Sequence, residues 1–352
     1  MELAAELAGA PGTVRVRGAG TKLRWAPDSG AAVEVSTAGL DRVVEHNAGD
    51  LTAVLEAGVP LARAQEVFAS AGQMLALDPP DAGGATIGGI VATNDSGPLR
   101  ARYGGPRDLV VGMRVALADG TVAKSGGKVI KNVAGYDLAK LFTGSFGTLG
   151  AILEVSVRLH PLPSATATAV GHTHSPHLLA GGATALTHAR VEQLGLDVRW
   201  AAGAGMVLAR FGGSTAREQA EAAAGLLRDA GLEAELAFED GSLWDAQREA
   251  QRSPAGLVAK VSALQTDVEE LAGVAERFGA TLVGRAGLGL LWLRLDEGDF
   301  AGLLAELRPR FLTAVLDRPS SLPFTPAEAG DRGAGLLAAR VKERFDPEGK
   351  LV

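Results

Sequence analysis

Cysteine is absent from this chain of 352 residues. Its absence excludes disulfides, cysteine-ligated zinc, iron–sulfur clusters, a thiol nucleophile and a cysteinyl link to a cofactor. Any redox or nucleophilic chemistry must therefore come from a bound organic cofactor, from a partner chain, or from oxygen- and nitrogen-bearing side chains.

Aromatic residues make up only 5% of the chain, and basic residues form no long stripe. With a net charge of −7, the chain lacks the clustered cations that neutralise phosphates, so we expect no nucleic-acid binding. No apolar run approaches the ~18 residues of a membrane span, and the start MELAAELAGAPG carries no basic residue. We expect a cytoplasmic protein without a signal peptide or a transmembrane segment.

Glycine is abundant and unevenly placed. The chain has 47 glycines, of which 15 lie within residues 83–150. A concentrated block of glycine indicates backbone that passes close to something, and a bound ligand is the natural candidate.

The first part of the chain alternates short strands with turns. We predict strands at 14–17, 32–36, 42–46, 53–56, 108–116 and 151–159, and helices at 60–71 and 137–142. The pair of prolines in His160-Pro161-Leu162-Pro163 predicts a domain boundary after residue 163.

Beyond this boundary the same order of elements occurs twice. Strand, helix, strand, strand and helix are predicted at 166–173, 176–189, 194–200, 205–211 and 215–230, and again at 257–263, 265–278, 280–286, 289–295 and 298–308. Two βαββα repeats predict one long antiparallel sheet with helices on one face. A last helix is expected at 336–345.

Three glycine-rich segments carry the chemistry. The first is Arg17-Gly18-Ala19-Gly20-Thr21-Lys22, which follows a strand and could bind a phosphate through backbone N–H groups, with Lys22 adding positive charge. A tight turn explains it as well, because neither a Walker loop nor a dinucleotide fingerprint is present.

The second segment runs from Asp78 to Asn94, DPPDAGGATIGGIVATN. Its prolines stiffen the approach, its paired glycines remove side chains, and its short polar groups suit a planar heterocycle held against backbone. The alternative is an irregular buried loop, but long loops inside compact domains are usually functional or disordered.

The third segment, residues 131–152, reads KNVAGYDLAKLFTGSFGTLGAI. From residue 100 to residue 131, seven basic residues are accompanied by only two acidic ones, Asp108 and Asp119. The basic residues are Arg100, Arg102, Arg107, Arg114, Lys124, Lys128 and Lys131. Such a field could attract a pyrophosphate or a carboxylate substrate, or the residues could form an ordinary solvated face.

Taken together and in order, these segments resemble the FAD-binding domain of vanillyl-alcohol oxidase type flavoproteins, over roughly residues 13–163. Phe146 in GSFGTLG, where most relatives carry Glu, and the KNVAGYD run make the chain most similar to the FAD-binding E subunits of bacterial glycolate oxidases.

The resemblance implies an α+β fold. Residues 1–163 would form a two-subdomain PCMH-type FAD-binding domain, and residues 164–330 an α+β cap with two βαββα, ferredoxin-like repeats. Residues 331–352 would form a helix and tail that pack back on the first domain.

The resemblance also implies the cofactor contacts. Residues 18–21 would wrap the pyrophosphate, the second segment would line flavin and ribityl, and the last strand would meet the cofactor. The candidate cofactor-binding residues are Gly18, Ala19, Gly20, Thr21, Lys22, Pro80, Gly84, Ala85, Thr86, Gly88, Gly89, Thr93, Gly150 and Ile152. Because Thr21 replaces the His that attaches flavin in some relatives, and no Cys exists, non-covalent FAD is expected.

The chain departs from relatives that oxidise 2-hydroxy acids unaided. Those carry an H-x-H metal pair and a later H-[AG]-G-[DE]-G-N segment, which is absent. His172, His174 and His177 are the only candidates for such a metal pair. We interpret them as exposed strand-end histidines, so no metal site is expected. The sequence identifies no catalytic base.

The resemblance supplies what the chain lacks: a larger D-type flavin subunit and an F-type iron–sulfur subunit. We therefore expect a FAD-dependent oxidoreductase subunit that supports oxidation of glycolate or a similar small 2-hydroxy acid. Membrane association, if any, would come through these partners. One alternative is a mainly structural subunit with a vestigial flavin site, which Ala19 and Phe146 support. The other is a self-sufficient oxidase of another alcohol or acid.

Overall fold

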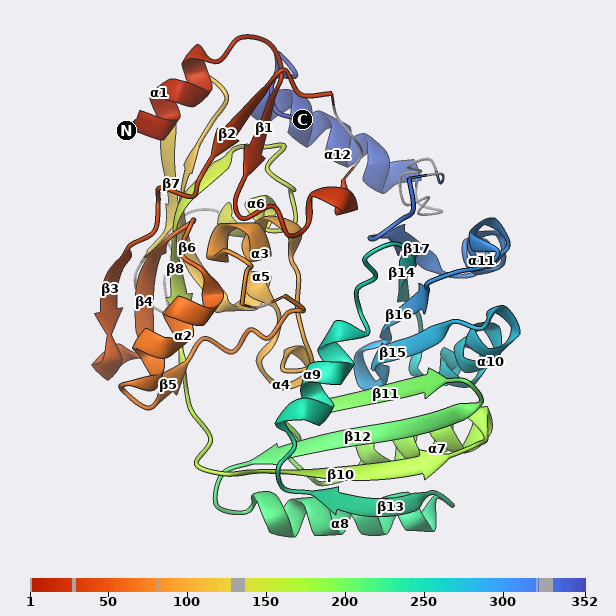
Figure 1. Cartoon of the computed structure of the whole chain (residues 1–352). Helices are drawn as coiled ribbons and strands as arrows, with labels where there is room; N and C mark the ends of the chain where they lie inside the picture. The colour runs from red at the N-terminus through yellow and green to blue at the C-terminus, as the bar shows by residue number, and fades with distance from the viewer. Residues whose placement is uncertain (1, 27–29, 82, 128–136, 321, 323–331) are drawn as a thin grey trace. The chain divides into compact units, whose positions relative to one another are not determined.

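A computed structural model of the chain describes residues 2–26, 30–81, 83–127, 137–320, 322 and 332–352 (Figure 1). It divides into two compact units. Unit 1 comprises Met1–Ser96, Tyr103–Leu162 and Asp331–Val352, and unit 2 comprises Gly97–Arg102 and Pro163–Gly330. The segment Gly97–Arg102, expected in the first domain, groups with unit 2 instead.

Unit 1 is built on a five-stranded antiparallel sheet with the strand order β3-β4-β8-β6-β7. The strands are β3 (Val43–Asn47), β4 (Thr52–Glu56), β6 (Val110–Ala116), β7 (Val122–Gly126) and β8 (Ala151–Arg158). Strand β4, between β3 and β8, is buried along its whole length, and Ala53, Val54 and Leu55 form a continuous apolar run within it. Helices α2 (Leu61–Ala69) and α3 (Ile87–Thr93) contribute Phe68 and Ile90 to the same core.

A second, smaller sheet of unit 1 pairs β1 (Val14–Arg17) with β2 (Val33–Ser36) in parallel. Val14 and Val35 are buried with Leu7 of helix α1 (Glu2–Gly9) and with Leu351. The other elements of unit 1 are η1 (Leu23–Trp25), η2 (Ala48–Asp50), β5 (Gln73–Met74), α5 (Pro106–Leu109), α6 (Ala139–Phe142), β9 (His160–Pro161) and α12 (Arg332–Phe345). Helix α4 (Arg100–Tyr103) crosses the boundary between the units.

Unit 2 contains one eight-stranded sheet in which every neighbouring pair is antiparallel. Its order is β13-β10-β12-β11-β15-β16-β14-β17 (Figure 1). The strands are β10 (Thr166–Thr173), β11 (Gly195–Ala201), β12 (Ala204–Gly212), β13 (Glu233–Ala237), β14 (Leu257–Ser262), β15 (Thr281–Arg285), β16 (Leu290–Leu295) and β17 (Leu312–Val315). The predicted long antiparallel sheet with two βαββα repeats is confirmed.

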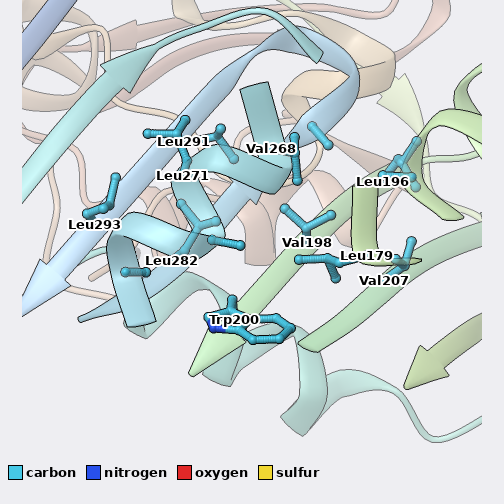
Figure 2. Packing of buried hydrophobic residues seen from close by; sticks show 14 of the residues in the cluster. Leu179, Leu196, Val198, Trp200, Val207, Val268, Leu271, Leu282, Leu291 and Leu293 are labelled. Carbon is cyan, nitrogen blue, oxygen red and sulfur yellow. The ribbon is translucent and has the colours of Figure 1, made fainter. Parts of the chain in front are cut away.

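Four helices cover one face of this sheet. They are α7 (Pro176–Thr187), α8 (Ala216–Asp229), α10 (Val268–Phe278) and α11 (Phe300–Leu307). Alternate residues of β11 face them, so that Val198 and Trp200 are buried with Leu179 of α7 and Leu271 of α10, as Figure 2 shows. This alternation is the period of two that a strand with one covered face requires.

Three elements of unit 2 were not predicted: β13, α9 (Gly241–Glu249) and β17. Helix α9 packs on the opposite face of the sheet, where Trp244 is buried with Val170 and Leu208. The stretch from 231 to 256, for which no helix or strand was predicted, thus holds an edge strand and this helix. Short 3₁₀ turns, η3 (Gln265–Asp267) and η4 (Ala286–Leu288), complete the unit.

The remaining predicted elements occur within a few residues of their expected bounds. In the predicted strand 108–116, however, Asp108 and Leu109 form the end of α5, because the Asp108 carboxylate accepts a hydrogen bond from the Gly105 N–H. Among the described residues, no helix is both long and apolar enough to cross a membrane.

A buried carboxylate attaches α9 to the sheet. Asp240 is 3% exposed and accepts hydrogen bonds from Thr168 Oγ1 at 2.7 Å and from Arg210 Nη2 at 2.8 Å. The Trp244 indole N–H in turn donates to Thr168 Oγ1 at 2.9 Å.

Replacing Asp240 by Ala should therefore lower the free energy of unfolding by about 3 kcal/mol, because Arg210 and Thr168 lose their buried acceptor. Urea denaturation measures this. The control is Asp245→Ala on the same helix, which removes an exposed pair with Arg248 and should cost less than about 1 kcal/mol. Equal losses in the two variants would contradict the anchoring role.

Candidate functional site

The first glycine-rich turn lies directly against the second. Strand β1 leads into Gly18, where a Cβ atom would stand 2.4 Å from the Thr86 side-chain oxygen. At Gly20 the backbone has a φ of +79°, a conformation that favours glycine. The Thr21 methyl group approaches Gly84, where a Cβ would lie 3.6 Å from it. The first two segments therefore pack together through positions that lack side chains.

The charge of Lys22 is already balanced. Its Nζ atom lies 3.3 Å from Asp95 Oδ2, and the two side chains are only 5% and 4% exposed. The ammonium also lies 5.9 Å from the centre of the Trp25 ring. An anion bound at this turn would meet an ion pair, not an isolated cation.

The second segment forms the start of α3. Thr86 caps this helix, since its side-chain oxygen accepts a hydrogen bond from the Gly89 N–H at 3.3 Å. Gly88 packs on the backbone of Ala57, where a Cβ would stand only 2.9 Å from the carbonyl oxygen. The Thr93 hydroxyl donates to the Gly89 carbonyl at 2.8 Å.

The residues that precede this helix are partly buried and partly exposed. Pro80 and Ala85 are buried, whereas Gly84 is exposed. Asp81 holds a left-handed φ of +56°, and its carbonyl accepts a hydrogen bond from the Ala85 N–H at 2.9 Å.

The third turn contacts the second segment and the strand that leads into the first turn. Its Phe146 N–H donates to the Ala92 carbonyl at 2.8 Å, and its Gly144 N–H donates to the Val91 carbonyl at 3.0 Å. At Gly147 a Cβ would lie 3.5 Å from the Val16 Cβ of β1. Segments far apart in the sequence thus converge at one place in unit 1. The first residues of the third segment, 131–136, lie outside the described residues.

Two candidate residues lie in the sheet. Ile152 on β8 is 4% exposed and belongs to the hydrophobic core of unit 1. At Gly150 a Cβ would stand 2.9 Å from the Ala116 carbonyl and 3.1 Å from the Phe142 ring. Packing within the sheet alone explains both residues.

Two buried polar atoms at the meeting point have no hydrogen-bond partner among the described residues: Asn94 Oδ1 and Ser145 Oγ. Gly144, the residue before Ser145, packs against Asn94, since a Cβ on it would be 3.4 Å from the Asn94 Cβ. Asn94 and Phe146 both hold left-handed backbone, with φ values of +51° and +56°. Strain and unsatisfied buried groups of this kind cluster at ligand sites.

Neither Asn94 nor Ser145 was among the residues predicted to bind a cofactor. Both lie within the quoted motifs, but only the folded backbone shows that their polar atoms are buried and unmatched. A flat, polar organic cofactor fits a site where glycines expose the backbone and where buried polar atoms lack a hydrogen-bond partner. The residues present are therefore compatible with FAD.

The seven basic residues do not act as one group within the part of the chain that is described. Arg114 lies 3.4 Å from the Glu154 carboxylate, and Arg102, in unit 2, lies 2.8 Å from Glu192. Lys128 and Lys131 lie outside the described residues. These contacts of Arg114 and Arg102 favour the interpretation as separate, solvated ion pairs over that of a common field that attracts anions.

The three clustered histidines turn to different partners. His172 contacts Glu235, His174 contacts the Gly203 carbonyl and His177 contacts Glu269, each at 3.0 Å. No group of three metal-ligating side chains occurs among the residues described. His172 and His174 instead line a cavity of about 430 Å³ in unit 2.

Comparison with known proteins relates the first part of the chain to FAD-binding domains. Residues 2–126 match the family model described as FAD binding domain. Over 125 residues the chain is 42% identical to glycolate oxidase subunit GlcE of Escherichia coli. The aligned segment covers 35% of this chain and 36% of that protein. Over 149 residues the chain is 38% identical to glycolate oxidase subunit GlcD of Bacillus subtilis, covering 42% and 32%.

A third relative, the mitochondrial cytochrome-type D-lactate dehydrogenase of Arabidopsis thaliana, is 38% identical over 145 residues, covering 41% of this chain and 25% of the relative. The matched segments thus span about a quarter to a third of the lengths of these relatives. These matches confirm the resemblance inferred from the sequence.

The fold of the whole chain is shared with a solved structure. Alkyldihydroxyacetonephosphate synthase matches with a TM-score of 0.70 at 16% identity, covering 96% of this chain and 72% of that one. The likeness confirms the predicted α+β fold class. Residues 2–126 of this chain match the FAD binding domain family, and this match together with the flavoprotein relatives supports FAD as the cofactor.

Proposed function

We propose that this chain is the FAD-binding subunit of a glycolate oxidase (dehydrogenase) complex. Unit 1 would be the FAD-binding domain and unit 2 a cap that faces substrate or partners. The observation that carries the proposal is that the first glycine-rich segment packs on the second, and the third turn on the end of α3, close to which the unmatched polar atoms of Asn94 and Ser145 are buried.

In this proposal the backbone of residues 18–21 holds the pyrophosphate, since its small side chains leave the N–H groups accessible. The segment from Pro80 to Thr93 lines the flavin and ribityl, together with Asn94 and Ser145. FAD is held without a covalent bond, because Thr21 offers no ring nitrogen and the chain has no cysteine.

The reaction would be oxidation of glycolate or a similar small 2-hydroxy acid to the 2-oxo acid. When bound, FAD supplies the acceptor for the hydride that leaves the α-carbon. The electrons must then leave through another chain, because these 352 residues contain no cysteine to ligate an iron–sulfur cluster.

Two partners follow from the family. A D-type flavin subunit and an F-type iron–sulfur subunit would complete the complex. The names of the relatives in Escherichia coli and Bacillus subtilis, both subunits of glycolate oxidase, support a multi-subunit assembly. We propose a cytoplasmic location, with any membrane contact made by the partners.

Titration of the purified chain with FAD tests the cofactor assignment. We expect saturable uptake of one FAD per chain and a visible flavin spectrum that survives gel filtration but is lost on denaturation, as a non-covalent cofactor requires. A protein that remains colourless and takes up no FAD would support the structural alternative. Steady turnover of a hydroxy acid by the isolated chain with an artificial dye would instead favour a self-sufficient oxidase.

Gly18→Ala probes the crowded contact directly. The new Cβ would stand 2.4 Å from Thr86 Oγ1, so the first two segments must move apart. We expect the dissociation constant for FAD to rise by about tenfold or more. Gly39→Ala is the control, because nothing lies within 4 Å of a Cβ at Gly39. The same affinity in both variants would show that the close approach is not needed for FAD.

A further inference from the structure

A lysine far along the sequence reaches the third glycine-rich turn. Lys342 lies on α12, and its Nζ atom donates to the Thr148 carbonyl at 2.7 Å. The same ammonium donates to the Leu351 carbonyl at 2.6 Å and to Asp346 Oδ2 at 2.5 Å. An ammonium has three N–H donors, so the donors of Lys342 are fully used.

Asp346 completes this arrangement. Its side chain is fully buried and accepts hydrogen bonds from the N–H groups of Lys350 and Leu351, at 3.0 and 2.7 Å. Burial opposes ionisation, but the hydrogen bonds from Lys342 and these N–H groups outweigh it and hold the pKa of the Asp346 carboxyl below its ordinary value. The carboxylate is therefore charged at neutral pH and fixes the path of residues 346–352.

These residues in turn hold β1. The Val14 N–H donates to the Lys350 carbonyl at 2.7 Å, and the Val352 N–H donates to the Val14 carbonyl at 2.9 Å. Leu351 is 1% exposed and packs in the same small core as Val14. Because β1 continues into Gly18, this contact sets where the first glycine-rich turn begins.

The third turn is held at two points by α12. Thr148 donates its N–H and its hydroxyl to the Ser145 carbonyl, at 3.0 and 2.7 Å, so fixing Thr148 also fixes Ser145. Phe345, on the same helix, packs edge-on against Phe142, with ring centres 5.5 Å apart. The Lys342–Asp346 pair thus connects the strand entering the first turn with the third turn.

We propose that Lys342 is a positioning residue for FAD: it holds the first and third glycine-rich turns in the spacing that the cofactor needs. The proposal rests on the FAD-binding function proposed above. It differs from a role in stability alone, because it links the docking of residues 346–352 to cofactor affinity. By thermodynamic reciprocity, bound FAD must then strengthen that docking.

The test compares FAD affinity in two lysine variants. Lys342→Met keeps the length of the side chain and removes its charge, and we expect the dissociation constant for FAD to rise by about tenfold or more. The control is Lys124→Met, which changes an exposed lysine on β7 of the same unit and should stay within about twofold of the unaltered protein. Lys342→Arg should recover most of the affinity.

A folded Lys342→Met variant with unaltered FAD affinity would overturn the proposal, as would an equal loss in Lys124→Met. If Lys342→Met does not fold, hydrogen exchange of the unaltered protein decides: FAD should slow exchange of the Lys350 and Leu351 amides, and unchanged exchange at these amides would refute the coupling. Failure of the unaltered protein to bind FAD at all would instead contradict the proposed function.

Discussion

The close approach of backbone at the glycine-rich turns is the constraint on which the rest of the site depends. No side chain fits at Gly18 beside the Thr86 side chain or at Gly88 beside the backbone of Ala57, so the first turn lies directly against the start of α3, and α3 lies directly against the residue that follows β4. The third turn is then hydrogen-bonded to the end of α3 through Gly144 and Phe146. Surfaces built this way offer N–H groups and short polar side chains, which are what a nucleotide cofactor needs.

Unit 2 is organised by a different principle. Its two βαββα repeats place alternate apolar residues of each strand under a layer of helices, and this periodicity is readable from the sequence, as at Val198 and Trp200. The repeats and their strand bounds were predictable for that reason. Strand β13 was not predictable, because its sequence alternates acidic with small residues at an exposed sheet edge. Helix α9 was not predictable either, because much of its sequence is polar and its position depends on contacts of Asp240 and Trp244 with the sheet.

The candidate site was predictable at the level of segments, and less so at the level of side chains. Glycine spacing shows where backbone must pass closely, but it does not show which charges pair across the fold. Lys22 was expected to offer a positive charge, yet Asp95 lies within ion-pair distance of it. Asn94 and Ser145 were passed over because burial of a single polar atom follows from tertiary structure alone. The seven basic residues appeared as one group in the sequence, but Arg114 and Arg102 pair locally with Glu154 and Glu192.

The central claim is that the three glycine-rich segments hold FAD together, in unit 1, and without a covalent bond. A crystal structure of this chain grown with FAD tests it most directly. The account predicts one FAD in contact with residues 18–21, with the segment from Pro80 to Asn94 and with the turn at Ser145, and no bond joining cofactor to protein. An FAD bound elsewhere in the chain, or one that touches only a single segment, would contradict the account.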